Sequence, residues 1–153
     1  MRVLGTVAVA VLQWGCVGPL SEDFESHYAS VAEARQRDAL GDHRWIPAIV
    51  PDAATQIVER HNIDTNATWG CFRLNGSGDH VSALLRGKGA RFDSGAVSEA
   101  PRSWLRKRPW WPDSMTNGKV EVAEFTEPGP PAPAIVRVGL DRTADLACFR
   151  RRR

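Results

Sequence analysis

Three polar residues that lie close together in the sequence could do chemistry: Glu59, His61 and Asp64, with Asn66 two residues further on. An imidazole beside carboxylates suits general acid–base catalysis, and the same side chains can bind a metal ion. A metal site needs a further His or Cys close by, and the other three histidines are scattered along the chain. The sequence therefore offers a possible polar site and predicts no metal ligands.

The same residues also suit a structural role. Asn62, Asp64 and Asn66 are turn formers whose side chains can bond to nearby backbone groups. In that interpretation His61 closes the C-terminus of a preceding helix. We favour the structural role. No Gly-x-Ser-x-Gly motif and no phosphate-binding glycine loop is present, so we predict no catalytic residue and no cofactor.

The N-terminus differs from the rest of the chain. Arg2 is followed by the apolar run VLGTVAVAVL, which is too short to span a bilayer and is typical of a secretory signal. The run leads to Gly15-Cys16, and a small residue before a cysteine resembles the lipobox of bacterial lipoproteins. That resemblance implies that Cys16 is lipidated and becomes the mature N-terminus. Gln13 and Trp14 depart from the usual lipobox. We expect a signal peptide over 1–15, a tether over 16–22, and one globular domain over 23–153.

Cys71 and Cys148 remain if Cys16 carries lipid. In an oxidising compartment the two could form a disulfide, whereas separate buried thiols would behave as small apolar residues. Both alternatives stay open from the sequence. Removing Arg2 with the signal leaves 19 basic and 18 acidic residues, so the mature domain has no general attraction to nucleic acid.

The pattern of residues predicts an α+β domain with two or three short helices packed on a small, mainly antiparallel sheet. Helices are expected from Val31 to about Leu40, over 52–60, and from Asp79 through Leu85, the first opened by a Ser-x-x-Glu capping box. Strands are expected near 24–28 and over 68–74, 119–125, 135–140 and 146–150. Residues 86–119 form a long loop rich in Trp, Pro and Arg.

That loop holds a possible interaction surface made of aromatic and basic residues: Trp104, Arg106, Arg108, Trp110 and Trp111. Exposed, they could contact a glycan, a peptide or an anionic polymer. Alternatively, the tryptophans pin the loop to the domain, because long loops without secondary structure need anchors. We favour pinning.

A wider resemblance appears from Trp45 to Phe72. The segment carries Trp-x-Pro-x3-Pro-x2-Ala-x2-Ile and then His-Asn-x-Asp-Thr-Asn-x2-Trp-x2-Phe. It resembles a family of small, uncharacterised bacterial exported lipoproteins. The resemblance covers roughly residues 24–150 and implies a location in the envelope and a compact fold, with no activity attached.

These observations predict an exported protein that is anchored by acylated Cys16 in the cell envelope, facing the periplasm or the cell surface. Its expected role is structural or interactive, with membrane lipid and an envelope protein or polymer as partners and without catalysis. One alternative is an envelope enzyme that uses the His61 and Asp64 region. A weaker alternative is a nucleic-acid binder that uses the basic C-terminal half. The sequence leaves the oligomeric state open.

Overall fold

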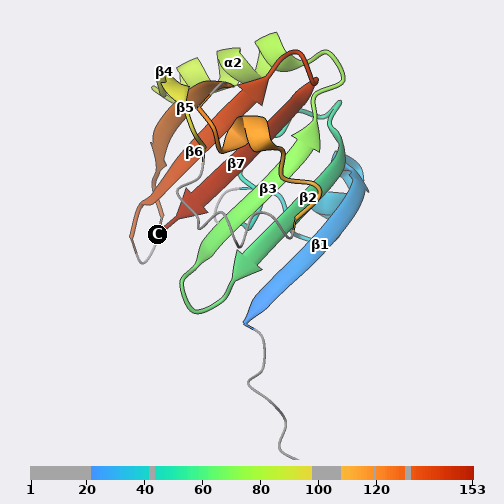
Figure 1. Cartoon of the computed structure of the whole chain (residues 1–153). Helices are drawn as coiled ribbons and strands as arrows, with labels where there is room; N and C mark the ends of the chain where they lie inside the picture. The colour runs from blue at the N-terminus through green and yellow to red at the C-terminus, as the bar shows by residue number, and fades with distance from the viewer. Residues whose placement is uncertain (1–21, 42–43, 98–107, 119, 130–131) are drawn as a thin grey trace, which may run out of the picture.

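The computed structural model describes residues 22–41, 44–97, 108–118, 120–129 and 132–153. They form one seven-stranded antiparallel sheet in the order β1-β2-β3-β7-β6-β5-β4 (Figure 1). The strands are β1 (Asp23–Ser30), β2 (Thr55–Asn62), β3 (Ala67–Arg73), β4 (Arg91–Gly95), β5 (Val120–Glu127), β6 (Ala134–Asp141) and β7 (Leu146–Arg152). The helices are α1 (Val31–Gln36), α2 (Gly78–Gly87) and the 3-10 turn η1 (Asp113–Met115).

The predicted α+β class is wrong, because the described chain is mainly β and its two α-helices are short. The largest error lies at 52–60, where β2 replaces the expected helix. Ala54, Ile57 and Val58 fit a helical spacing, but Ile57, Glu59 and His61 also alternate along a strand. Pairing with β1 on one side and β3 on the other bonds the backbone of this segment on both edges, and that favours the strand.

The first helix is opened as predicted and ends early. Ser30 Oγ accepts from the Glu33 N–H at 3.3 Å, while Glu33 Oε2 reaches back to the Ala29 N–H at 2.7 Å. The helix ends at Gln36, before the expected end at about Leu40, and Asp38 follows with a φ of 57°. The capping box therefore sets the start of α1 and not its length.

Strands β1, β3, β5, β6 and β7 and helix α2 lie where the sequence predicts them, within a few residues. The expected loop over 86–119 contains an additional strand, β4, at the edge of the sheet. Its residues are mostly exposed. Because this short edge strand lacks apolar alternation, it could not be predicted from the pattern of residues.

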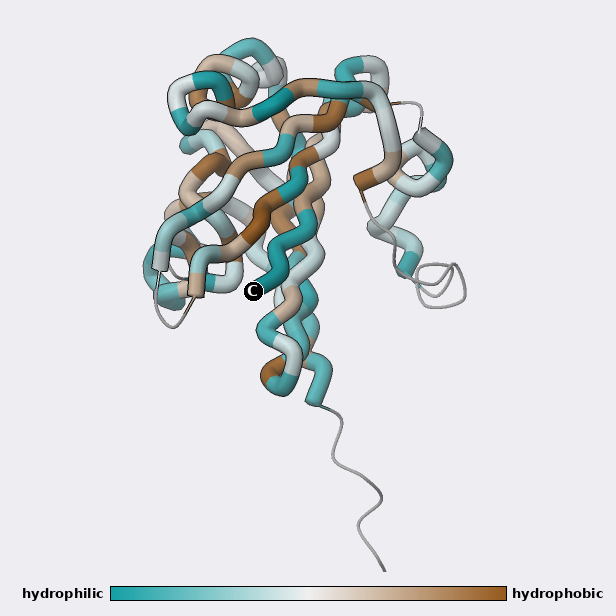
Figure 2. The backbone as a smooth tube through the Cα atoms, turned by 90° about the vertical axis from the view of Figure 1, so that its left-hand side faces the viewer, coloured by the Kyte–Doolittle hydropathy of each residue, from teal (hydrophilic) through white to brown (hydrophobic). Residues whose placement is uncertain are grey.

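Two layers of cover lie on opposite sides of the sheet, as the side view in Figure 2 shows. One side, the helix-covered face, packs Phe72 and Phe149 of the central strands against Val31, Ile46 and Leu85. The other side, the disulfide face, packs a smaller cluster: Cys71, Val97, Trp111, Met115, Val120, Val122 and Cys148.

The disulfide joins Cys71 to Cys148, 77 residues apart in the sequence. The two residues are directly opposite each other on the adjacent strands β3 and β7. Both are buried, with exposed fractions of 2% and 0%. The sequence left open whether these cysteines are bridged or are separate thiols. In the structure they form a disulfide.

Candidate functional site

Glu59 and His61 of the expected polar site do meet. They lie two residues apart on β2, so both side chains project from the helix-covered face. His61 Nδ1 lies 3.0 Å from Glu59 Oε2 and 3.2 Å from Oε1. Ser26, opposite Glu59 on β1, forms a further side-chain hydrogen bond to this carboxyl.

Aromatic rings cover this pair. The ring of Trp45 stacks on His61 at 3.9 Å between centroids and 7° between planes. Phe24, opposite His61 on β1, stacks at 5.5 Å and 20°. Glu59 is 1% exposed and the His61 side chain is 12% exposed. A substrate would have to displace Trp45 to reach the carboxyl.

Burial raises the pKa of the Glu59 carboxyl above its ordinary value, and the hydrogen bond from His61 offsets only part of this effect. A buried carboxyl with a raised pKa beside an imidazole resembles an acid–base pair. The enclosed pair also suits a structural role, because its contacts join β1, β2 and the segment that contains Trp45.

Asp64 and Asn66 do not join this pair. Both lie in the exposed turn between β2 and β3, where Asn66 has a φ of 51°. The side chain of Asp64 instead bonds to the Glu22 carboxyl, and this bond raises the pKa of Glu22. Asn62 Oδ1 accepts from the Thr65 N–H at 2.8 Å, which is the Asx turn that the sequence indicated. His61 does not close a helix, because it lies within strand β2.

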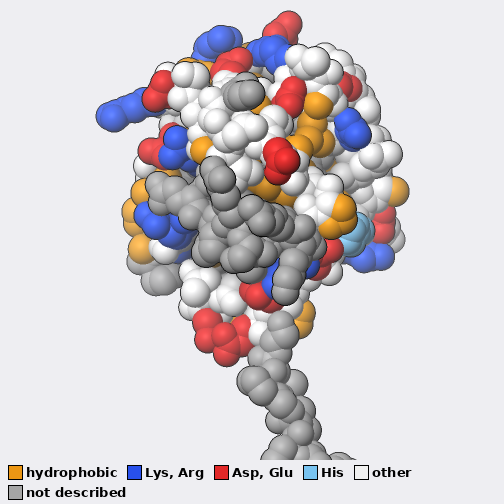
Figure 3. Space-filling view, in the orientation of Figure 1, with side chains coloured by type: hydrophobic (Ala, Val, Ile, Leu, Met, Phe, Trp, Pro, Cys, Tyr) orange, Lys and Arg blue, Asp and Glu red, His pale blue; other side chains and the backbone are white. Residues whose placement is uncertain are grey.

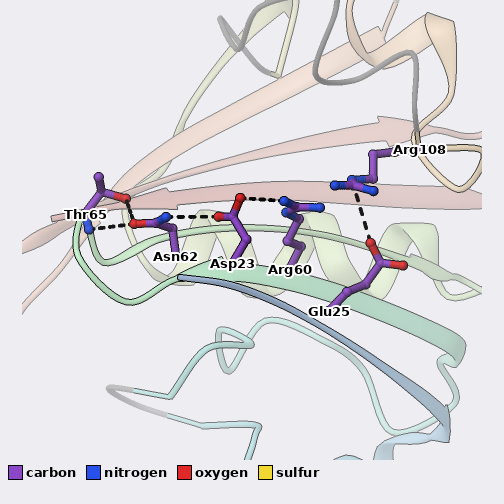
Figure 4. A network of polar contacts seen from close by, with 6 residues as sticks. All are labelled: Asp23, Glu25, Arg60, Asn62, Thr65 and Arg108. Carbon is purple, nitrogen blue, oxygen red and sulfur yellow. Dashed lines mark hydrogen bonds and ion pairs between the residues drawn. The ribbon is translucent and has the colours of Figure 1, made fainter. Parts of the chain in front are cut away.

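The opposite face of β1 and β2 carries a second polar network, drawn in Figure 4. Asp23 pairs with Arg60 and accepts from Asn62 Nδ2 at 3.0 Å. Burial acts to raise the pKa of Asp23, but the bonds from Asn62 and Arg60 outweigh it and the pKa is lowered. Beside it, Arg108 Nε lies 3.7 Å from Glu25 Oε2.

A second buried polar pair on the helix-covered face, Glu127 with Arg151, was not predicted from the sequence. Arg151 Nε donates to Glu127 Oε2 at 2.7 Å, and each residue is at most 3% exposed. Thr68, opposite Arg151 on β3, is fully buried, and its hydroxyl has no hydrogen-bond partner among the described residues. These residues are far apart in sequence, so only the strand register brings them together.

The predicted interaction surface is only partly visible, because Trp104 and Arg106 lie outside the described residues. Trp111 is 5% exposed and packs in the disulfide-face cluster. Trp110 is partly buried and meets Trp111 edge to face, with centroids 6.0 Å apart. These two tryptophans anchor their segment to the sheet and do not form an open platform.

A shallow hollow lies beside the edge strand β4. It is lined by residues of α2, β4 and β5 and the segment before β5: Arg86, Phe92, Asp93, Ser94, Gly118, Val120 and Glu121. The Arg86 guanidinium lies over the Phe92 ring at 5.2 Å. Charges of both signs line the hollow, so it indicates no single class of ligand.

Among the residues that the structure describes, no group of three or more His, Cys, Asp or Glu side chains is placed to hold a metal ion. None of the helices in this part of the chain is long and apolar enough to cross a membrane.

A family model described as the YbbD head domain matches residues 22–73. The matched segment runs from the start of β1 to the end of β3. It includes Glu59, His61 and their aromatic cover, and it includes Cys71 but not Cys148. No curated protein and no solved structure matches the chain.

Proposed function

We propose that this chain is an exported protein held on the cell envelope through acylated Cys16. Its single domain presents a surface to another envelope component and carries out no catalysis. The apolar run over 3–12 serves as the export signal, and Cys16 serves as the site of lipid attachment. The first strand begins at Asp23, so only a short tether separates the domain from Cys16.

The observation that carries the proposal is the Cys71–Cys148 disulfide. Disulfides persist in oxidising compartments outside the cytosol and are rare within it. This one joins two central strands inside the disulfide-face cluster, so it is part of the folded core. A domain built around a disulfide suits an exported location, and the N-terminal sequence points the same way.

We propose an interactive role rather than catalysis because the candidate acid–base residues are enclosed or lie apart. Glu59 and His61 form a pair, but Trp45 covers it and Asp64 lies elsewhere. An envelope enzyme that uses this pair is the second candidate, favoured by the short contact and the raised pKa of Glu59. It would require Trp45 to swing away from His61 when substrate arrives.

The test is metabolic labelling with an alkyne fatty acid in a bacterial host that processes lipoproteins. The wild-type protein should take up the label and appear in the membrane fraction. Cys16→Ser should lose the label. Cys71→Ser is the matched control and should keep it, because that cysteine lies in the buried core. An unlabelled wild-type chain, or a label that depends on Cys71, would contradict the anchor.

A further inference from the structure

Three arginines and an exposed isoleucine form a compact block on the disulfide face. Arg137 of β6 is directly opposite Arg150 of β7, and Ile135 is directly opposite Arg152. Because alternate residues of a strand share a face, all four side chains project from the same side of the sheet. We call these four residues the arginine block.

The block is electrostatically unfavourable by itself. Like charges directly opposite each other on neighbouring strands destabilise a sheet. Arg150 already interacts with another group, so it is not counted among the available cations. Arg137 and Arg152 form no ion pair with any residue that the structure describes, and Arg137 Nε is buried without a hydrogen-bond partner. Ile135 is 44% exposed. Two guanidinium groups beside an exposed apolar side chain suit an anionic, partly apolar surface.

The block lies at the end of the sheet where the chain enters. Asp23 pairs with Asn62, and Asn62 pairs with Ala67. Since Thr68 pairs with Arg151, Ala67 and Arg152 lie side by side one residue further along. Arg152 is thus level with the first residue of β1, three strands or roughly 14 Å away. In Figure 3, basic and apolar side chains lie together on the side where the C-terminus emerges.

The distance to a bilayer is short at this end. Glu22 is the sixth residue after Cys16, and a fully extended chain of six steps reaches at most about 20 Å. Of the acidic groups nearby, Asp23 is bonded to Arg60 and Asn62, and Glu22 shares a hydrogen bond with the carboxyl of Asp64. Glu124 of β5 is directly opposite Arg137 on the same face, so the three arginines of the block outnumber the one carboxylate beside them.

We propose that the arginine block docks on the anionic phospholipid headgroups of the membrane that holds Cys16. Arg137 and Arg152 bind headgroup phosphates, and Ile135 enters the interface. This inference rests on the proposed lipid anchor and adds an orientation to it: the tether end of the sheet faces the bilayer, and the hollow beside β4 lies toward the other end. Lipid headgroups are favoured over a soluble anion because the tether keeps the block within reach of them.

The test uses the mature, acylated protein in vesicles that contain anionic phospholipid and a headgroup-nitroxide lipid as quencher. The acylated Cys16 and the disulfide leave no free thiol, so one added cysteine can carry a fluorophore. Thr126→Cys places it opposite Ile135 on β5. Thr143→Cys is the matched control, exposed in the turn between β6 and β7. The fluorophore at 126 should be quenched and the one at 143 should not.

Neutral vesicles should abolish the difference between the two positions. In anionic vesicles the double variant Arg137→Gln/Arg152→Gln should lower the ratio of docked to undocked domains by about 25-fold. Arg73→Gln, at the far end of β3, should leave it unchanged. Equal quenching at both positions in an anchored protein would overturn the docking face and leave the anchor standing. A chain that carries no acyl group and does not enter vesicles would overturn the proposed function and the docking face with it.

Discussion

The two faces of the sheet are closed in different ways. The helix-covered face is filled by apolar residues of α1, α2 and the segment that contains Ile46 and Ile49, packed on Phe72 and Phe149. The disulfide face has a smaller cluster, held by the Cys71–Cys148 bond and by Trp111 and Met115 of the segment before β5. One face relies on packed area and the other on a covalent bond.

The faces also treat charge differently. On the helix-covered face, Glu59, Glu127 and Arg151 are buried and bonded to each other or to neighbours. On the disulfide face, charges such as Arg60 and Asp23 remain partly exposed. The charged residues of the helix-covered face are thus enclosed, whereas those of the disulfide face remain open to solvent. This contrast is why we propose that contacts with other molecules are made by the disulfide face and the ends of the sheet.

The largest effect is expected from removing the covalent closure. In the chain-entropy model a disulfide that closes a loop of this length stabilises by about 4.5 kcal/mol. Cys71→Ala/Cys148→Ala should therefore lower the free energy of unfolding by about that amount, measured by urea denaturation. An unchanged denaturation midpoint would mean that the disulfide face is held by packing alone.

Breaking the buried pair on the helix-covered face should come next. Arg151→Met leaves the Glu127 carboxylate buried without its partner and should cost at least about 3 kcal/mol. Arg151→Met/Glu127→Leu removes both charges and should recover most of that loss. If the double variant is as unstable as the single one, the cost comes from lost packing and not from the uncompensated charge.

A matched pair of glycine substitutions compares how rigid the two faces are. A Cβ on Gly70 would meet the Phe149 ring at 2.5 Å and the Val58 carbonyl oxygen at 2.7 Å. On Gly139 it would meet the ends of the Val97 and Met115 side chains, which can move. Gly70→Ala should cost about 3 kcal/mol and Gly139→Ala about 1 kcal/mol in unfolding measurements. The reverse order would show that the disulfide face is the tighter one.

The smallest effects concern pH, and they have opposite signs on the two faces. Glu59 has a raised pKa in the folded state, so its contribution to stability is present below its ordinary value of 4.5 and is lost as pH rises. Glu59→Gln should therefore gain relative to the wild type as pH rises above that value.

Asp23 has a lowered pKa, so its contribution is present above its ordinary value of 3.8 and is lost as pH falls. Asp23→Asn should gain relative to the wild type as pH falls below that value. Urea denaturation across the acidic range measures both differences, and equal slopes for the two variants would contradict this assignment.

Much of the sheet could be predicted from the sequence. Strand β3 and the three C-terminal strands are apolar runs between turn formers, and those signals are local. Segment 52–60 was predicted wrongly because its apolar spacing fits a helix and a strand equally well. The pairing of β2 with β1 and β3 decides between them. Strand β3 follows directly after the turn at 63–66, but β1 is separated from β2 by α1 and the Trp45 segment, and pairing over that distance in the sequence leaves no local mark.

The candidate site was predictable to a similar degree. Glu59 and His61 meet because residues two apart on a strand share a face. Asp64 was grouped with them by its closeness in sequence, but it lies beyond the end of the strand. The Trp45 cover and the Thr68–Arg151–Glu127 group depend on chain segments that only the completed fold brings together.

The intact mass of the protein from a membrane fraction, with and without reductant, tests the central claim most directly. We expect a chain that begins at Cys16 with added acyl mass and gains two hydrogens on reduction. A chain that begins at Met1 without acyl mass would contradict the anchored, exported location. It would return the basic C-terminal half to consideration as a nucleic-acid surface.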